Sequence, residues 1–445
     1  MKMRHAGQDA LPQVLGGRAP VDRAGFQRRV QALRAVLDLH PAKRWALICD
    51  DAGWFGAGLL ALAARGRSVV LPQSPQPGSL SDTGVEAVLT DRPMDFRQFE
   101  TLALMEPGDE FRPVPTAPDD EARVEFYTSG SSGAPKCVPK AYRQLRLEVE
   151  ALERQWGSEL AGATVLGTVP HHHLYGLLFR VLWPLTAGRP FAADMCLQPG
   201  ELRAAAGAGR CVLVSSPAFL GRISDYSQLP SSAQVAGLFS SGAPLPDAAA
   251  QSLREWGRAA VEVYGSTETG GVAWRAWDGA ADRAWWSLIG GVDTQIRQEE
   301  TGPRLWVRSG CTYGQDWMPT GDLARFGDDG RFMLLGRADD VLKFEDKRVS
   351  LSEMRAHLLR HPWVAEARLL LLPGRRQHIG AVVVLRPERH GAERRELREA
   401  LRSWMAERYE TLLIPRKWRF PEALPDNAMG KTEQARLLAL FEDQP

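Results

Sequence analysis

The stretch Tyr127–Lys136 reads YTSGSSGAPK, and it indicates more about the architecture than any other part of the chain. Glycines let the backbone turn tightly and bring N–H groups close to an anion, hydroxyl groups add donors, and Lys136 adds a positive charge. A short apolar run at Val124 and Phe126 precedes this stretch, and a longer polar and apolar segment follows Pro139. The stretch is suited to a polyphosphate, although Ser/Gly-rich loops are more often plain connectors, so the rest of the chain must decide.

Composition and charge exclude several classes of protein. The chain has 445 residues, too many for one compact core, so we expect two or three domains. A net charge of +1 gives no electrostatic reason to expect nucleic acid or a membrane as a partner. No run of about 18 apolar residues and no signal peptide is found, and the five scattered cysteines fit neither a disulfide framework nor a zinc site. We therefore expect a cytoplasmic protein with reduced thiols and no membrane insertion.

Strand-like and helix-like segments alternate from about residue 44 to 265. This alternation predicts an α/β fold with doubly wound sheets, in which ligands bind at the carboxyl ends of the strands. The predicted strands are Trp45–Cys49, Ser68–Leu71, Glu86–Leu89, Val124–Thr128, Ala163–Thr168, Cys211–Ser215, Val235–Ser240 and Val261–Tyr264. The predicted helices between them include Gly53–Ala64, Ala141–Trp156 and Pro246–Trp256.

The pattern changes twice in the second half of the chain. After residue 270, short segments joined by Gly, Asp and Pro predict antiparallel strands, and after Gly336 helices surround strands such as Glu366–Leu372. We predict a large N-terminal domain, residues 1–336, of doubly wound sheets with a β-rich subdomain. A small mobile α+β domain, residues 337–445, is predicted to follow it. From Arg337 onward the chain carries 21 Lys and Arg against 17 Asp and Glu, a net charge of +4, for which a solvated helix face is the default explanation.

Five further motifs bear on the function of the opening loop. Two follow predicted strands directly, one is a turn that presents a carboxylate, and two lie in the C-terminal part. They are Ser240–Leu245 (SSGAPL), Val263–Glu268 (VYGSTE), Pro319–Asp322 (PTGD), Gly336–Lys343 (GRADDVLK) and Pro425–Lys431 (PDNAMGK). Each is weak alone, but their joint occurrence in this order resembles the adenylate-forming superfamily of acyl-CoA synthetases, peptide-synthetase adenylation domains and luciferase-like enzymes. The resemblance runs from about Val124 to Lys431, and residues before about 110 carry little of it.

The resemblance implies an ATP-dependent ligase with Mg²⁺, which forms an acyl- or aryl-AMP and then transfers the acyl group to a phosphopantetheine thiol. It implies that the loop residues Thr128, Ser129, Gly130, Ser131, Ser132, Gly133 and Lys136 hold the β- and γ-phosphates. It also assigns the adenine side of the nucleotide to Ser241, Gly242, Ala243, Pro244, Tyr264 and Gly265. Thr267 is expected to bind the α-phosphate and Glu268 the Mg²⁺, while Asp322 takes the ribose hydroxyls and Arg337 supports the nucleotide. Lys431 is expected to bridge the carboxylate and the α-phosphate, and Asp339 aligns with the hinge of the mobile domain.

The run Pro170–Gly176 (PHHHLYG) invites comparison with a metal site. Three adjacent histidines on a strand end cannot all face one ion, and no further ligand pattern accompanies them. By resemblance we expect His173, with Tyr175 and Gly176, to line the acyl pocket. The segment Gly176–Pro184 is predicted to be an apolar helix, which either forms one wall of that pocket or belongs to the core.

The thiol acceptor is less certain than adenylation. Asp346 stands where the family commonly has a glycine close to the pantetheine arm, which weakens the case for free CoA. Acyl carrier proteins are generally acidic, and the Lys/Arg excess between Arg386 and Arg419 would complement one. CoA and a carrier protein are therefore both open as acceptors of the acyl group.

The sequence fits four other functions less well. A stand-alone amino-acid-activating domain usually carries an acidic residue in its substrate pocket, and none occurs after Pro217 at the expected place. A non-catalytic nucleotide-binding homologue would be expected to have lost Lys431, Glu268 or Asp322. A P-loop kinase is disfavoured because Pro425 occupies the position of the first glycine of that motif, and no nucleophile elbow of a serine hydrolase is found.

Overall fold

The computed structural model describes residues 14–17, 20–72, 80, 83–96, 98–108, 110–129, 135–277, 279, 283–314, 316–338, 341–344, 347–372, 378–409, 411, 413–425 and 434–442. The chain divides into two compact units. The first contains residues 1–293 and 307–318, and the second contains residues 294–306 and 319–445. The domain boundary near Asp339 stays a prediction, since Asp339 lies outside the described residues.

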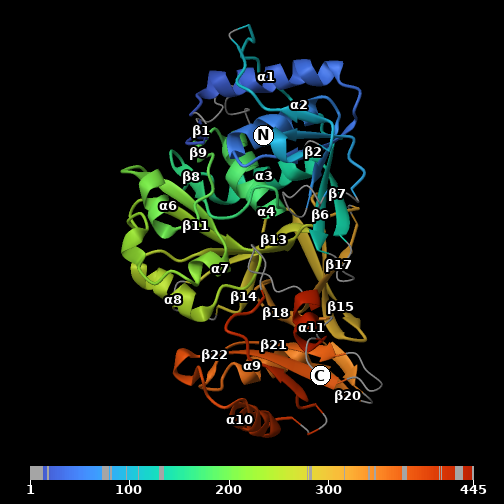
Figure 1. Ribbon diagram of the computed structural model, residues 1–445, viewed down its shortest axis with the longest axis vertical. Coiled ribbons are helices and arrows are strands. Elements are labelled where there is room, and N and C mark those ends of the chain that lie inside the picture. The colour runs from blue at the N-terminus through green and yellow to red at the C-terminus, as the bar shows by residue number, and fades with distance from the viewer. Residues whose placement is uncertain are drawn as a thin grey trace. The chain divides into compact units, whose positions relative to one another are not determined.

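A six-stranded sheet carries the opening loop in the first unit. Its order is β5 (Thr101–Ala103), β4 (Ala87–Thr90), β2 (Arg44–Ile48), β3 (Ser68–Leu71), β6 (Arg123–Ser129) and β7 (Pro135–Ala141). The strands are parallel except for β6 and β7, which form an antiparallel hairpin around the loop. The helices α1 (Arg23–Leu39) and α2 (Ala52–Ala64) pack against each other beside this sheet (Figure 1). Asp22 and Asp51 begin the two helices by accepting hydrogen bonds from the N–H groups of Gly25 and Trp54.

A second sheet of the first unit carries the VYGSTE motif. Its order is β1 (Val14–Leu15), β9 (Phe191–Ala192), β8 (Thr164–Gly167), β10 (Cys211–Ser215), β11 (Val235–Ser241), β12 (Val261–Ser266), β13 (Gly270–Ala276) and β14 (Trp285–Leu288). The strands are parallel as far as β12 and antiparallel beyond it. Motifs after β11 and β12 therefore lie at the carboxyl ends of neighbouring parallel strands, where α/β folds bind ligands.

Helices cover both faces of this second sheet. Because side chains alternate along a strand, Val212 and Val214 of β10 pack in the same cluster as α3 (Tyr142–Trp156). Leu213 instead packs in the cluster of α6 (Pro199–Ala206), α7 (Pro217–Leu220) and α8 (Asp247–Trp256) (Figure 1). The predicted doubly wound α/β fold is confirmed in this way, and the strands predicted at Ser68–Leu71 and Cys211–Ser215 have those bounds.

The second unit combines a β-rich part with an α+β part. The first is built on β15 (Val292–Glu299), β16 (Gly302–Ser309), β17 (Met318–Phe326) and β18 (Phe332–Arg337). The second contains the hairpin β19 (Val341–Phe344) and β20 (Lys347–Ser350), and a sheet of β21 (Val364–Leu372), β22 (His378–Leu385) and β23 (Lys417–Arg419). Its helices are α9 (Leu351–Leu358), α10 (Arg394–Ala406) and α11 (Gln434–Glu442). Short 3-10 helices in the described part of the chain include η2 (Pro93–Phe96), η4 (Tyr226–Gln228) and η5 (Pro387–Arg389).

The histidine segment differs from its prediction. β8 ends at Gly167, so the three histidines lie in a turn and not on a strand end. The predicted helix over Gly176–Pro184 begins earlier and has a π-helical centre: α4 (Leu174–Gly176), η3 (Leu177–Leu182) and α5 (Trp183–Ala187) follow one another. Pro184 has no N–H group to continue an α-helical ladder, which accounts for the wider turn before it. No helix in the described part of the chain has the length and apolarity that a membrane span requires.

Candidate active site

An ion pair joins the Ser/Gly-rich loop segment to the VYGSTE motif. The Lys136 Nζ atom, at the start of β7, lies 2.7 Å from Oε1 of Glu268, which follows β12. The Lys136 side chain is 59% exposed and that of Glu268 is 27% exposed, so both groups remain accessible to a ligand. Partial burial tends to raise the pKa of Glu268, but the hydrogen bond and charge of Lys136 outweigh it and the pKa is lowered. Glu268 is therefore an anion at neutral pH.

The turn that presents Thr267 and Glu268 is held by its own side chains. The Ser266 Oγ atom accepts a hydrogen bond from the Thr269 N–H group at 3.1 Å, and Thr269 Oγ1 accepts one from the Ser266 N–H group at 3.0 Å. A Cβ atom on Gly265 would lie 2.2 Å from the carbonyl oxygen of Gly270. Only glycine fits at Gly265, because the strands β12 and β13 approach so closely at this bulge.

Helix α3 supports this turn from behind. Glu148 Oε2 accepts a hydrogen bond from the Gly271 N–H group at 2.9 Å, and Lys140 Nζ donates to the carbonyl oxygen of Cys311 at 2.5 Å. Between them, Gln144 Nε2 donates to the carbonyl oxygen of Thr312 at 2.8 Å. These three buried polar residues were not predicted from the sequence. Lys140 lies on β7, whereas Gln144 and Glu148 are four residues apart on one face of α3, and that spacing was the signal available.

The predicted adenine segment follows β11. Ser241 Oγ donates to the carbonyl oxygen of Val263 at 2.8 Å, which ties the ends of β11 and β12 together. Gly242 has φ of +97°, so this turn favours glycine. Tyr264 presents a partly buried ring, whose centroid lies 5.6 Å from that of Trp286. The structure thus places Ser241, Gly242 and Tyr264 on neighbouring strand ends, while their contact with adenine stays a prediction.

Asp322 and Arg337 are brought together in the second unit. They face each other across β17 and β18, and Nη1 of Arg337 lies 3.8 Å from Oδ1 of Asp322. A Cβ atom on Gly321 would lie 2.4 Å from the Arg337 guanidinium, so glycine makes room for this side chain. The turn before Asp322 is fixed by Thr320, whose Oγ1 donates to the carbonyl oxygen of Leu305 at 2.9 Å. The arrangement leaves a carboxylate and a guanidinium side by side, which suits the predicted ribose contact.

The predicted acyl-pocket residues lie in the turn and helix after β8. His171 is buried, its Nε2 atom lies 2.8 Å from the carbonyl oxygen of Cys49, and burial lowers its pKa to about 3. His171 is therefore a neutral core residue, whereas His173 is only partly buried at the start of α4. A Cβ atom on Gly176 would lie 2.0 Å from the carbonyl oxygen of Pro170, which explains the glycine by packing. The acyl-pocket role of His173, Tyr175 and Gly176 stays a prediction.

Several predicted site residues lie outside the described part of the chain. Thr128 is described, and its Oγ1 lies 3.4 Å from the carbonyl oxygen of Lys136 across the hairpin. The residues and side chains that are not described are Gly130, Ser131, Ser132, Gly133, Asp339, Asp346 and Lys431, together with the side chain of Ser129. Their predicted roles stay predictions.

Comparison with known proteins shows the family and the fold. A sequence model of the AMP-binding enzyme family matches residues 51–305, so the likeness begins well before Val124, where the predicted resemblance started. The chain is 31% identical to the 4-coumarate–CoA ligase of Rhodobacter capsulatus over 326 residues, which cover 71% of this chain and 76% of that protein. It is 28% identical to the 3-hydroxybenzoate–CoA/4-hydroxybenzoate–CoA ligase of Thauera aromatica over 360 residues, 73% of this chain and 67% of that protein.

The solved structures establish the fold. ATP-bound MatB from Rhodopseudomonas palustris superposes with a TM-score of 0.79 at 19% identity, over 98% of this chain and 97% of that one. The chain therefore belongs to the AMP-binding enzyme family, and the prediction of an AMP-forming acid–thiol ligase of the acyl-CoA synthetase type is confirmed.

Proposed function

We propose that the protein activates a small carboxylic acid with ATP and passes the acyl group to the thiol of CoA. The observation that carries this proposal is the ion pair between Lys136 of the Ser/Gly-rich loop and Glu268 of the VYGSTE turn. In this pair, a cation that can bind phosphate groups lies beside a carboxylate that can bind a metal ion. The names of the relatives, 4-coumarate–CoA and hydroxybenzoate–CoA ligases, support an aryl or small acyl acid as substrate.

The reaction has two half-reactions. In the first, a carboxylate oxygen of the acid attacks the α-phosphorus of ATP, the bond between the α-phosphorus and the bridging oxygen breaks, and pyrophosphate leaves. In the second, a thiolate attacks the acyl carbon, AMP leaves, and the thiol proton goes to solvent. Little covalent chemistry is required of the protein, so positioning and charge neutralisation dominate. Lys136 neutralises the charge of the leaving pyrophosphate. Thr267 donates a hydrogen bond from its hydroxyl group to the α-phosphate, and Lys431 bridges the carboxylate and the α-phosphate.

Glu268 fits the metal that this chemistry uses. Mg²⁺ binds through one or two carboxylates together with phosphate oxygens and water, and Glu268 is an accessible, ionised carboxylate beside a phosphate-binding cation. Glu268 would hold the ion, which when bound neutralises phosphate charge. Asp322 accepts hydrogen bonds from the ribose hydroxyls, and the Arg337 guanidinium lies 3.8 Å from that carboxylate.

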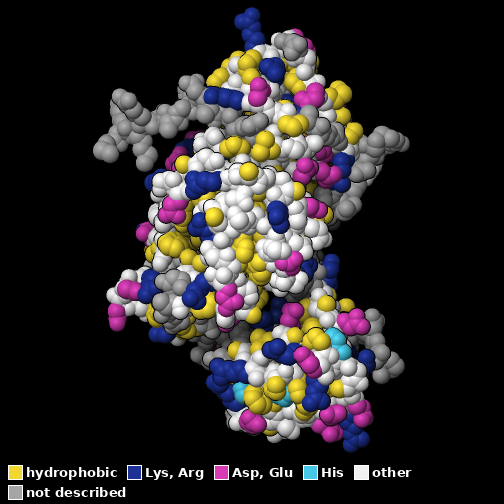
Figure 2. Space-filling view, turned by 90° about the vertical axis from the view of Figure 1, so that its left-hand side faces the viewer, with side chains coloured by type: hydrophobic (Ala, Val, Ile, Leu, Met, Phe, Trp, Pro, Cys, Tyr) yellow, Lys and Arg dark blue, Asp and Glu magenta, His cyan; other side chains and the backbone are white. Residues whose placement is uncertain are grey.

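An acyl carrier protein is the second candidate acceptor. On helix α10, Arg394, Arg395 and Arg398 are exposed, in a region where Lys and Arg outnumber Asp and Glu. Figure 2 shows these side-chain types intermixed on the face of the second unit that it presents, so the positive excess is modest.

All five cysteines are described and none forms a disulfide, which supports the cytoplasm as the place of reaction.

Acid-dependent exchange of labelled pyrophosphate into ATP tests the first half-reaction. We expect exchange with at least one acid from a panel of aryl, fatty and amino acids, without any thiol present. No exchange with any acid of the panel would contradict the proposal. Adding CoA, free phosphopantetheine or a carrier protein to the active acid then identifies the acceptor by the thioester that forms.

A further inference from the structure

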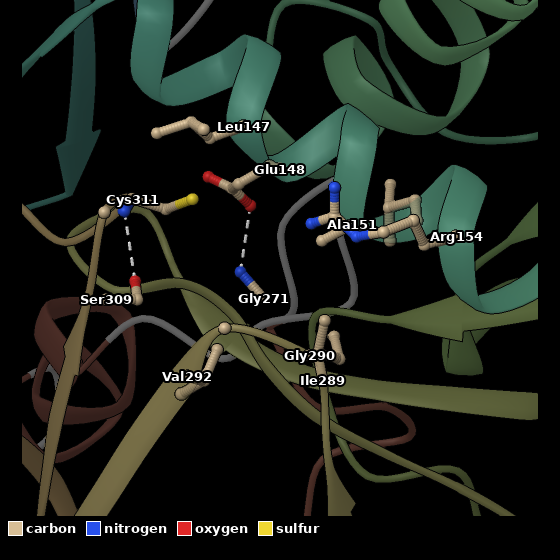
Figure 3. Close-up of a pocket in the computed structure, with 13 residues that line it drawn as sticks. Leu147, Glu148, Ala151, Arg154, Gly271, Ile289, Gly290, Val292, Ser309 and Cys311 are labelled. Carbon is tan, nitrogen blue, oxygen red and sulfur yellow. Dashed lines mark hydrogen bonds between the residues drawn. The ribbon is translucent and has the colours of Figure 1, made fainter. Parts of the chain in front are cut away.

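A small pocket of about 120 Å³ lies behind the VYGSTE turn in the first unit. One wall is α3, and the opposite wall comes from the segment that joins β14 to β15, with Gly271 and the 309–311 turn between them. In Figure 3, Glu148 points from α3 across the pocket to Gly271, Cys311 and Arg154 lie on either side, and Ile289 and Val292 face α3 from the other wall.

The backbone connects this pocket to the candidate active site. Gly271 is three residues beyond Glu268 on the same turn and strand. On the other side, the Tyr313 N–H group donates to the carbonyl oxygen of Glu268 at 2.8 Å, only two residues after Cys311. Thr267 and Glu268 are expected at the α-phosphate, where the substrate carboxylate reacts. The pocket therefore borders the strand and turn at which the carboxylate of the acid is expected to react.

Two charged residues line the pocket: Glu148 is buried, and Arg154 is exposed. Glu148 is 6% exposed, and burial raises its pKa. One of its oxygens accepts the hydrogen bond from Gly271, and the other, Oε1, has no hydrogen-bond partner among the described residues. The Lys140 Nζ atom lies 3.9 Å from Oε1, beyond hydrogen-bond distance, and donates to the Cys311 carbonyl oxygen instead. A buried acceptor that lacks a donor is costly, so Oε1 is a ready partner for a donor on a ligand.

The remaining lining suits a ring or a short chain. The apolar side chains are Leu147, Ala151, Leu152, Ile289 and Val292. An apolar cavity of about 150 Å³ is known to accept benzene, so a volume of this order is right for a phenyl-sized group. A largely apolar pocket with few convergent polar groups is the usual form of a small-molecule site.

We infer that this pocket receives the distal part of the carboxylic acid, and that Glu148 selects acids whose distal end carries a hydrogen-bond donor such as a hydroxyl group. The inference rests on the proposed function, because it assumes that an acid reacts at the Thr267–Glu268 turn. Glu148 acts here as a specificity-determining residue and takes no part in bond making. A site built to accept a substrate hydroxyl rejects the analogue that lacks it more strongly than an apolar pocket rejects an extra group.

Pairs of acids that differ by one hydroxyl group test the inference. Pyrophosphate exchange is measured with benzoate and 4-hydroxybenzoate, and with cinnamate and 4-hydroxycinnamate. We expect kcat/KM of the wild type to favour the hydroxylated acid of at least one pair by roughly 10-fold to 100-fold. Glu148→Gln leaves one oxygen to serve both Gly271 and the substrate, so this preference should fall about 10-fold while KM for ATP stays unchanged.

Two further variants keep the test decisive. Glu150→Gln changes a partly exposed carboxylate on the same helix and should leave the preference unchanged. Gly290→Val fills space at the pocket wall, where no atom lies within 4 Å of an added Cβ, so it should fold normally and raise KM for the larger acids selectively. If Glu148→Gln does not fold, the wild-type preference and Gly290→Val decide.

The outcomes separate the two claims. Exchange with no preference for a hydroxylated acid, or a preference that Glu148→Gln leaves intact, overturns the inference and leaves the proposed function standing. Gly290→Val with unchanged KM for every acid also overturns it. Absence of exchange with every acid contradicts the proposed function and the inference together.

Discussion

At the scale of single residues, the ion pair of Lys136 and Glu268 joins the proposed phosphate-binding cation to the proposed metal-binding carboxylate. In the absence of ligands the two side chains neutralise each other, and both are partly exposed. We expect Lys136→Met to lower kcat/KM for ATP by roughly 10-fold to 100-fold, since a charge-assisted hydrogen bond to phosphate is lost. Exchange assays at varied ATP measure this, and an unchanged kcat/KM would rule out a phosphate contact.

The same pair predicts a dependence of stability on pH. The pKa of Glu268 is lowered in the folded protein from its ordinary value of 4.5, so its stabilising effect is present above that value and is lost as pH falls through the folded pKa. Both groups are partly exposed, and we expect a coupling of about 0.2 to 1 kcal/mol. A double-mutant cycle of Lys136→Met and Glu268→Gln, followed by thermal unfolding, should show this coupling at pH 7 and its decline below pH 4.5.

Gly265 tests the turn itself. Replacement by Ala places a Cβ atom 2.2 Å from the Gly270 carbonyl oxygen, so β12 and β13 must separate and Thr267 and Glu268 must move. We expect Gly265→Ala to lower the exchange rate at least 10-fold in a protein that still folds, because small misplacements of positioning groups are costly. The matched control is Gly200→Ala, where no atom lies within 4 Å of the added Cβ, and it should leave the rate unchanged.

The grouping of charged residues in this site was partly predictable from the sequence. The motifs around Lys136, Glu268 and Asp322 identified charged groups that the structure pairs, with Lys136 beside Glu268 and Asp322 beside Arg337. Glu148 was missed, because an acidic residue within an amphipathic helix ordinarily lies on the solvated face. Its burial depends on the neighbouring strand β13, which is distant in sequence.

At the scale of secondary-structure elements, the run of α4, η3 and α5 depends on one buried cation. Arg180 is 1% exposed, and its guanidinium donates to the carbonyl oxygens of Val169 at 2.6 Å and Asp194 at 2.9 Å. Burial lowers its pKa to about 10, so it remains charged at neutral pH. The charged Arg180 side chain thus ties η3 to the backbone at Val169, just before the three histidines, and at Asp194.

We expect Arg180→Met to destabilise the protein by about 2 to 4 kcal/mol, because the buried Val169 carbonyl group and the partly buried Asp194 carbonyl group lose their donor. Denaturant unfolding measures this effect. Arg222→Met, which removes an exposed cation, is the control and should change stability by less than about 0.5 kcal/mol. Equal stability of the two variants would show that Arg180 has no structural role.

Most of the elements could be predicted, and the exceptions have physical reasons. The strands of the parallel sheets are continuous apolar runs, so β3 and β10 were found with their bounds. The π-helical turn was not found, since it depends on Pro184 and on the buried contacts of Arg180 and not on periodicity. The short strand β1 was also missed, because two residues are too few for a pattern.

At the scale of the whole molecule, the account requires Lys431 for adenylation only. Lys431 lies outside the described residues, and its role follows from the resemblance of its motif. We expect Lys431→Ala to abolish pyrophosphate exchange while thioester formation from preformed acyl-adenylate persists, since the family resemblance predicts that the small domain rotates between the half-reactions. Loss of both half-reactions in a folded variant would show that the assigned role is wrong.

The central claim is that the acid attacks the α-phosphorus of ATP. The most direct test uses an accepted acid labelled with ¹⁸O in its carboxylate and mass spectrometry of the nucleotide product. The account predicts that the product is AMP and that it carries one ¹⁸O atom from the acid. ADP as product, or AMP without the label in complete turnover, would contradict it.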